Sequence, residues 1–382
     1  NWNVATNWIP GSVPDANRCV IIPNTKTAVI GAGTNAFAKN IKVQSGGKLE
    51  IAGNLTVTDF IKNETGNADN FVVKSDGNLI QINPVTNTDP IRAERDVTDM
   101  DNVLATQMDY VYWSAPVSGQ KLRGTAGEGG FSPGTPNNRF FEYNESNDYF
   151  VSTPDAVFTP GKGYAIRAED GYSNGYDKTY VFRGVPNNGE VSINIKRSAD
   201  VGTVQHGFNL VGNPYPSNID FTKLYANNSG LIYNTAYFWT NSTYTPTQQG
   251  SSYGGNNYAV FNGIGGNPPT GGTYQTAPNG IVKVGQGFIV QKKDTGGPVP
   301  LVFKNSYGAG QDLRVGTAGT FYQKSSGDIN RFWLQLKSPL NLINTQLIGY
   351  GEGATADYEQ DYDAEIMGLS SDVFYSKAGD RK

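Results

Sequence analysis

Four carboxylate side chains alternate along one short stretch near the end of the sequence: Asp357, Glu359, Asp361 and Asp363. Calcium takes several hard oxygen ligands from a flexible turn, so this stretch predicts a calcium site. The spacing differs from that of an EF-hand loop, which carries glycine at its sixth position. The alternative is a solvated acidic loop that caps turns or pairs with Arg331. A weaker candidate spans residues 170–177, which Asx-turn chemistry explains equally well.

A second kind of site depends on aromatic rings, because an exposed ring can stack on a sugar ring. The rings that would form such a glycan-binding platform are Trp239, Tyr244, Tyr253 and Tyr258. The alternative is that these side chains alternate into the core of a sandwich, as aromatic residues in strands usually do.

Residues for catalysis are hard to assemble from this sequence. His206 is the single histidine, so the sequence holds no histidine cluster for zinc or copper, and a Ser/His/Asp site would depend on one imidazole. Paired carboxylates for glycoside hydrolysis stay open, because their separation in the fold cannot be read from sequence. We therefore assign no catalytic and no cofactor-binding residue, and we expect a non-catalytic protein with a structural His206.

The charge balance excludes some partners. The chain has 30 Lys and Arg against 34 Asp and Glu, a net charge of −4, so nothing attracts nucleic acid or an anionic membrane broadly. No apolar run approaches the ~18 residues of a membrane-spanning helix, so we expect no transmembrane helix. The single cysteine, Cys19, excludes an internal disulfide. Its apolar neighbours predict a buried structural thiol.

Short alternating apolar runs between Gly, Asn and Asp predict an all-β fold with few or no helices. In residues 1–88, Ile41–Leu49 parallels Val72–Leu79, with Ser45 and Ser75 30 residues apart. Coils joined by Gly-rich corners are what a short β-solenoid or β-helix-like domain needs. A small sandwich is the alternative.

Residues 89–325 contain a second pattern, which occurs twice in the same order. Tyr112–Ser118 is echoed by Leu210–Ser217, and Gly161–Ile166 is echoed by Gly285–Val290. We interpret these repeats as two related β-sandwich (jelly-roll-like) units, at about 89–200 and 201–325. Chance similarity of Gly-rich turns is the alternative.

Residues 326–382 predict the start of a carboxy-terminal β domain, because Arg331–Leu336 and Gln346–Tyr350 alternate as two paired strands would. The chain opens without an initiator Met or a signal peptide, so we expect a mature or trimmed form. If the last domain is incomplete at Lys382, its open edge can accept a strand from a neighbouring chain.

Several of these motifs together resemble secreted surface proteins of flavobacteria, in the Bacteroidota. The resemblance rests on Asn7-Trp8 with Gly11–Pro14, on the Ser-Gly-Gly-x-Leu coils, and on the repeated motifs of both units. The region from Arg331 to Ala364 resembles the start of the carboxy-terminal sorting domain of type IX secretion cargo.

The resemblance implies export by the type IX secretion machinery of the outer membrane and an extracellular or cell-surface location. The expected function is that of an adhesin or a structural surface protein, with surface glycans or neighbouring copies as partners. The first alternative is a glycan-binding module of a polysaccharide-utilising surface protein. A polysaccharide hydrolase or lyase is the less favoured alternative.

Overall fold

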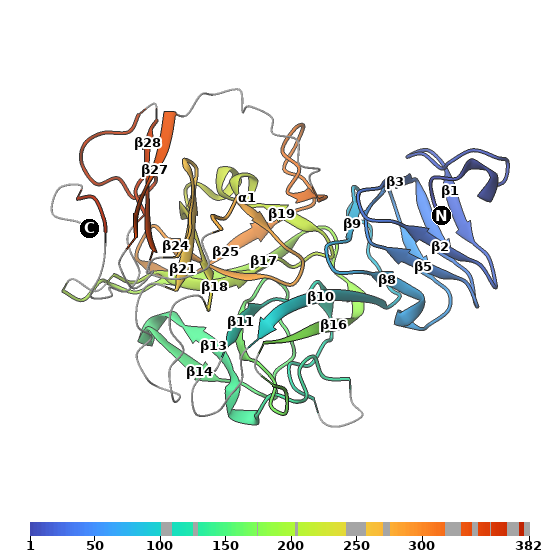
Figure 1. Cartoon of the computed structure of the whole chain (residues 1–382), viewed down its shortest axis with the longest axis horizontal. Helices are drawn as coiled ribbons and strands as arrows, with labels where there is room; N and C mark the ends of the chain where they lie inside the picture. The colour runs from blue at the N-terminus through green and yellow to red at the C-terminus, as the bar shows by residue number, and fades with distance from the viewer. Residues whose placement is uncertain are drawn as a thin grey trace.

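The computed structural model of the chain describes residues 1–100, 109–124, 129–173, 175–202, 205–241, 257–269, 276–317, 330–337, 343–351, 353–364 and 374–377. It is almost entirely β, and these ranges contain a single α-helix, α1 (Phe221–Asn228). A solenoid is followed by antiparallel sheets (Figure 1), so the predicted fold class is confirmed. Short 3₁₀ turns lie at Ala5–Asn7, Ala68–Asn70, Asn137–Arg139 and Glu145–Asn147.

The amino-terminal part is a β-solenoid of about four turns, with parallel strands stacked on three faces. The first coil holds β1 (Cys19–Ile22), β2 (Thr27–Ile30) and β3 (Asn35–Ala38). The second holds β4 (Asn40–Val43), β5 (Lys48–Ile51) and β6 (Asn54–Val57). The third holds β7 (Ile61–Asn63), β8 (Phe71–Val73) and β9 (Asn78–Gln81).

Every second side chain of each solenoid strand points inward, and these side chains fill the interior of the solenoid. In β1, Val20 and Ile22 are buried, whereas Cys19 and Ile21 point outward. Successive side chains of a strand point to opposite faces, so one inward aliphatic residue forces its neighbour out. The expected buried thiol is therefore wrong: Cys19 is exposed, and its Sγ accepts a hydrogen bond from Asn40 Nδ2 at 3.4 Å.

The coil period differs from the offset seen in the sequence. Thr27 pairs with Lys48, 21 residues further along the chain. Ser45 lies at the corner between β4 and β5, whereas Ser75 lies at the corner between β8 and β9. The same Ser-x-Gly corner is thus used on two different sides of the coil, so the 30-residue offset is not the coil period.

A ladder of hydrogen-bonded asparagines runs along one corner of the solenoid and ends in a contact with the second antiparallel unit. Asn54 Nδ2 donates to Asn35 Oδ1 at 2.7 Å, and Asn78 Nδ2 donates to Asn54 Oδ1 at 3.0 Å. The last oxygen, Asn78 Oδ1, accepts the backbone N–H of Asn218 at 2.7 Å. This chain of hydrogen bonds attaches the second antiparallel unit to the end of the solenoid.

The solenoid also shares a sheet with the first antiparallel unit. Strand β10 (Ile91–Met100) pairs in parallel with β8 and antiparallel with β16 (Tyr176–Pro186), which pairs with β12 (Val117–Ser118). The resulting sheet has the order β12-β16-β10-β8-β5-β2. No linker separates the two parts.

Strand pairing then repeats in the order in which the motifs repeat. The first unit has the sheet β11-β15-β13-β14 beside the pair β10–β16. The second has β18-β24-β20-β21-β22 beside the pair β17–β25. The bounds in the first unit are β11 (Tyr110–Trp113), β13 (Phe140–Asn144), β14 (Tyr149–Ser152) and β15 (Tyr164–Arg167). Those in the second are β17 (Val191–Arg197), β18 (Phe208–Gly212), β20 (Ile232–Trp239), β21 (Tyr258–Asn262), β22 (Gly265–Asn267), β24 (Gly287–Lys292) and β25 (Gly296–Phe303).

The two units meet through the Gly-x-Gly turns that the sequence repeats. Trp113 of the first unit forms a β-bridge with Gln286 of the second, and Lys162 forms the reciprocal bridge with Val211. Because each unit contributes the same two elements, the contact has the form of a two-fold interface within one chain. Aromatic side chains of both sheets pack together beside these bridges.

The remaining elements complete the second unit. Asp220 caps α1 by accepting the N–H of Thr222 at 2.8 Å, and Phe221 and Leu224 are buried beneath the helix. A small sheet joins β23 (Ile281–Val282), β19 (Asn218–Asp220) and β26 (Arg314–Val315) in that order. No helix among the described residues is long and apolar enough to cross a membrane.

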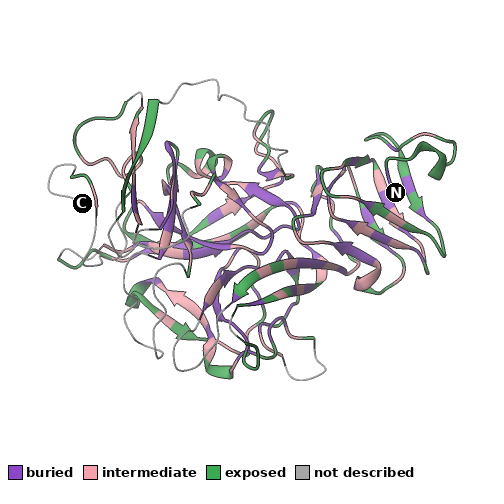
Figure 2. Ribbon diagram, in the orientation of Figure 1, coloured by how far each residue is buried: buried purple, intermediate pink, exposed green. Residues whose placement is uncertain are grey.

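The hairpin of β27 (Asn330–Lys337) and β28 (Ile343–Tyr350) lies at the end of the molecule far from the solenoid (Figure 1). Strand β27 is exposed along its whole length (Figure 2). Its outer face carries half-exposed apolar side chains at Phe332, Leu334 and Leu336.

Candidate functional site

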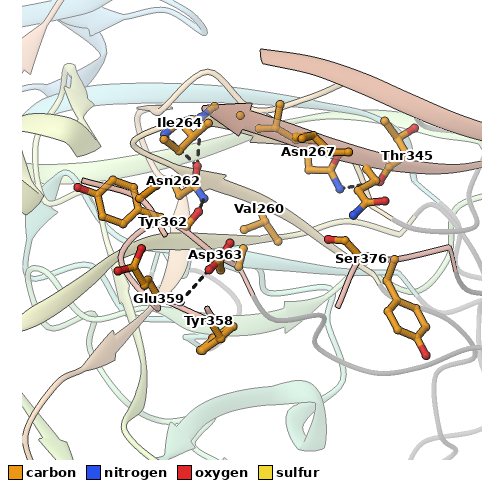
Figure 3. A pocket seen from close by; sticks show the side chains of 18 of the residues that line it. Val260, Asn262, Ile264, Asn267, Thr345, Tyr358, Glu359, Tyr362, Asp363 and Ser376 are labelled. Atoms are coloured by element: carbon orange, nitrogen blue, oxygen red, sulfur yellow. Dashed lines mark hydrogen bonds between the residues drawn. The ribbon is translucent and has the colours of Figure 1, made fainter. Parts of the chain in front are cut away.

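A pocket of about 230 Å³ opens between β21–β22, the hairpin strand β28 and the segments 353–364 and 374–376 (Figure 3). In this view Asn267 and Thr345 lie at one end of the pocket, and Asn262 with Tyr362 lies at the other. Parts of the chain separated by more than a hundred positions form its walls.

Asn262 builds one end of the pocket. Its Oδ1 accepts the N–H groups of Ile264 and Gly265 at 3.0 and 3.1 Å, which closes the tight turn between β21 and β22. Its Nδ2 donates to the carbonyl oxygen of Tyr362 at 2.7 Å. A single side chain therefore shapes the hairpin and holds the acidic segment against it.

Close approach of β28 to β22 builds the other end. Asn267 Nδ2 donates to the carbonyl oxygen of Thr345 at 2.7 Å, and Trp333 Nε1 donates to that of Gly266 at 3.1 Å. A Cβ at Gly349 would lie 2.3 Å from Ile264 Cγ2, so a larger residue there must displace the Ile264 side chain. The Oδ1 atom of Asn267 is buried and accepts no hydrogen bond from the residues described.

The predicted calcium ligands divide between the pocket and its surroundings. Glu359 and Asp363 line the pocket, whereas Asp357 is exposed. Asp361 forms an ion pair with Lys293 Nζ at 2.8 Å and accepts the N–H of Asn234 at 3.0 Å. Over the described ranges, no three His, Cys, Asp or Glu side chains gather as a metal site would require. The calcium site stays a prediction.

The expected pairing of this segment with Arg331 is not the one observed. Arg331 Nη1 donates to the carbonyl oxygen of Ile264, and the cation that holds the acidic segment is Lys293. The turn-capping expectation describes two of the other carboxylates, Glu359 and Asp363. Glu359 Oε2 accepts the N–H of Thr355 at 2.8 Å, and Asp363 Oδ2 accepts that of Glu359 at 2.7 Å.

The predicted aromatic platform lies at the contact between the two units. Trp239 stacks on Tyr112 of the first unit, with ring centroids 5.6 Å apart. The hydroxyls of Tyr258 and Tyr112 are 2.7 Å apart, and burial raises the pKa of Tyr258 to about 12. Of these rings, Tyr258 also lines the pocket. Tyr244 and Tyr253 lie outside the described residues, and glycan binding by these four stays a prediction.

Some signals in the sequence were missed. Asn262-Gly263 follows the apolar run of residues 258–261 and is a hairpin signal, which marks the turn that shapes the pocket. Residues 171–175 read Gly-x-Ser-x-Gly, the spacing of a nucleophile elbow. That elbow requires a strand followed by a helix, whereas here the exposed Ser173 lies in the connection from β15 to β16. Residues 250–254 have the same spacing and lie outside the described residues.

His206 lies at the rim of the second unit, just before β18. Its backbone N–H donates to Asp200 Oδ1 at 3.0 Å, and its carbonyl oxygen accepts Gln291 Nε2 at 2.9 Å. Both contacts use the backbone, and no described carboxylate or hydroxyl contacts the imidazole through a hydrogen bond. The expected structural role of His206 stays a prediction.

The architecture defines an all-β protein in which a short parallel solenoid continues into two antiparallel units with repeated pairing. The chain belongs to the family described as Domain of unknown function (DUF8693), whose model matches residues 1–382. Neither a curated protein nor a solved structure matches the chain.

Proposed function

We propose that the chain is the contact part of an adhesin, carried to the cell surface or beyond it by the type IX secretion machinery. It acts without catalysis and holds a surface glycan in the pocket beside β21, β22 and β28. The observation that carries the proposal is the lining of this pocket, where tyrosine rings and amide, hydroxyl and carboxylate groups converge on one cavity.

This lining suits a sugar, which presents hydroxyl groups around its edge and C–H groups on its faces. Sites for small molecules combine apolar walls with a few fixed polar groups that set orientation. Val260 and Ile264 supply apolar walls, and Asn267 supplies an amide held in place by its bond to Thr345. Fixed groups lose little freedom on binding, which favours affinity.

Binding to immobilised glycans, followed by calorimetry on the best ligand, tests the proposed site. Ala364 is exposed at the rim of the pocket, so Ala364→Trp should fill the cavity without removing a contact. Ala16→Trp, at an exposed position on the solenoid, is the matched control. We expect a loss of affinity of at least tenfold in the first variant and none in the second. Absence of binding to any glycan overturns the proposal.

The proposed location is tested separately in the cells that make the protein. Protease added to intact cells should degrade the protein, and loss of the type IX machinery should leave it protected within the cell envelope. Unchanged protection in the two strains contradicts this part of the proposal.

One observation favours a second role, that of a structural protein that packs against neighbouring copies. The outer face of the hairpin exposes Phe332, Leu334 and Leu336, at 42%, 40% and 51% of their surface. Contiguous apolar surface of this kind marks contact sites in many proteins. Sedimentation of the wild type and of Leu334→Lys distinguishes the roles, because only a self-associating protein changes its mass with this substitution.

A further inference from the structure

The charge of the pocket lining is one-sided. Glu359 and Asp363 contribute two carboxylates, and no Lys, Arg or His is among the described residues that line the cavity. Charges that face a partly enclosed cavity interact more strongly than charges in open water. The lining therefore repels anions and attracts a positive group.

Two basic residues beside the walls of the pocket are engaged elsewhere. Lys293 pairs with Asp361, which does not line the pocket, and Arg331 donates to the carbonyl oxygen of Ile264. Neither forms an ion pair with Glu359 or Asp363 within the described part of the chain. Among the described residues, no ion pair balances the carboxylates of Glu359 and Asp363, so a positively charged ligand can do so.

Three hydrogen-bond acceptors of the lining have capacity that the described residues leave unused. Glu359 and Asp363 each use one carboxylate oxygen to accept a backbone N–H of their own segment. Their second oxygens accept nothing from the described residues, and a carboxylate has room for about four donors. The buried Oδ1 of Asn267 adds a third acceptor without a donor in the described ranges. The buried Asn267 Oδ1 costs free energy unless a donor reaches it.

We infer that the pocket binds a sugar that carries a free, protonated amino group. An ammonium group supplies three hydrogen-bond donors and the positive charge that the lining lacks. The sugar hydroxyls donate to the remaining acceptors, and the ring lies against the apolar wall at Val260 and Ile264. This inference depends on the proposed glycan-binding function and names the class of glycan.

Calorimetry with three sets of oligosaccharides of equal length tests the inference on the whole chain. The sets are oligomers of glucosamine, the same oligomers fully N-acetylated, and oligomers of a uronic acid. We expect the free amine to bind at least tenfold more tightly than the acetylated form, and the uronate to bind most weakly. Raising the salt concentration should reduce the preference, since salt screens the charges.

Two isosteric variants connect the preference to the carboxylates. Glu359→Gln and Asp363→Asn keep an oxygen for the backbone N–H groups but remove the charge. Each should lower the affinity for the free amine by at least fivefold and leave the acetylated oligomer within twofold. Asp357→Asn, at an exposed carboxylate outside the pocket, should change neither affinity.

The outcomes separate this inference from the function on which it rests. Equal or tighter binding of the acetylated or uronate oligomers, blocked by Ala364→Trp, overturns the amino-sugar inference and preserves the glycan-binding function. Binding of no oligosaccharide overturns both. If calorimetry detects binding of calcium but of no oligosaccharide, both are overturned and the predicted calcium site is supported instead.

Discussion

The backbone N–H of Ser114 donates to the carbonyl oxygen of Gly285 at 2.9 Å. Its counterpart in the other unit, Gly212, donates to the carbonyl oxygen of Gly161 at 3.0 Å. These two bonds are related by the same exchange of units as the β-bridges beside them. They place the ends of β11 and β18 each against the Gly-x-Gly turn of the other unit.

This contact leaves no room for a side chain at Gly212. A Cβ there would lie 2.3 Å from Ser114 Cβ, so Gly212→Ala must displace one unit from the other. We expect this variant to lower the free energy of unfolding by about 1–3 kcal/mol, the usual cost of overpacking. Denaturant unfolding measures the change.

The partner residue supplies the control for that experiment. Ser114→Gly removes the atom that clashes, so the double variant should recover part of the lost stability, as coupled neighbours do. Ser114→Ala should be near neutral, because the Ser114 hydroxyl is buried without a hydrogen-bond partner in the described structure. Additive losses in the double variant would contradict the proposed clash.

A buried arginine connects the solenoid to the second unit, and it has no ion pair within the described residues. Arg314 is 3% exposed, and burial lowers its pKa to about 10. It donates to the carbonyl oxygen of Leu79 and, at 3.0 Å, to Ser217 Oγ. Arg314→Met leaves these acceptors buried and should cost about 3 kcal/mol in denaturant unfolding. Arg18→Met, at an exposed site, should cost less than about 0.5 kcal/mol. Equal losses in the two variants would show that the buried hydrogen bonds contribute little.

Asp76 connects three parts of the chain by charge. Its Oδ1 lies 2.9 Å from Arg95 and 2.9 Å from Lys283. Burial raises its pKa, but these two cations outweigh burial and hold the pKa below its usual value. A lowered pKa stabilises the fold above the unfolded value of about 3.9, and this contribution is lost as pH falls through the folded value.

The matching experiment compares Asp76→Asn with the wild type by unfolding at several pH values. The carboxylate is more than half exposed, so solvent screening limits the expected loss near pH 7 to about 0.5–1 kcal/mol. The difference between the two proteins should shrink below about pH 4 and in high salt. A difference that is the same at pH 3 and pH 7 contradicts the ion-pair explanation.

Asp361 should hold the acidic segment against the second unit. Asp361→Asn removes the ion pair with Lys293, so hydrogen exchange of residues 353–364 should become faster by about threefold to tenfold. Asp357→Asn provides the control in the same segment. Mass spectrometry of the exchanged peptides resolves the two cases, and equal rates in both variants would rule out this anchoring role.

Local patterns predicted the fold better than they predicted the site. Alternation in strands such as β1 is a property of neighbouring residues, and the Gly-x-Gly motifs repeat in the order in which the strands pair. The 30-residue offset between Ser45 and Ser75 is not the coil period, because one corner motif occurs on two sides of the solenoid. The pocket depends on β28 and residue 362 reaching β21–β22 from far along the chain, which no local pattern encodes.

The sheet that continues from the solenoid into the first unit has a mechanical consequence. When two domains are joined by a flexible linker, a pulling force first extends the linker before it reaches the second domain. Here β8, β10 and β16 are joined by backbone hydrogen bonds, and a pull on the first coil reaches the first unit across the sheet. Tension on the solenoid would therefore load the first unit directly, through the backbone hydrogen bonds of the shared sheet.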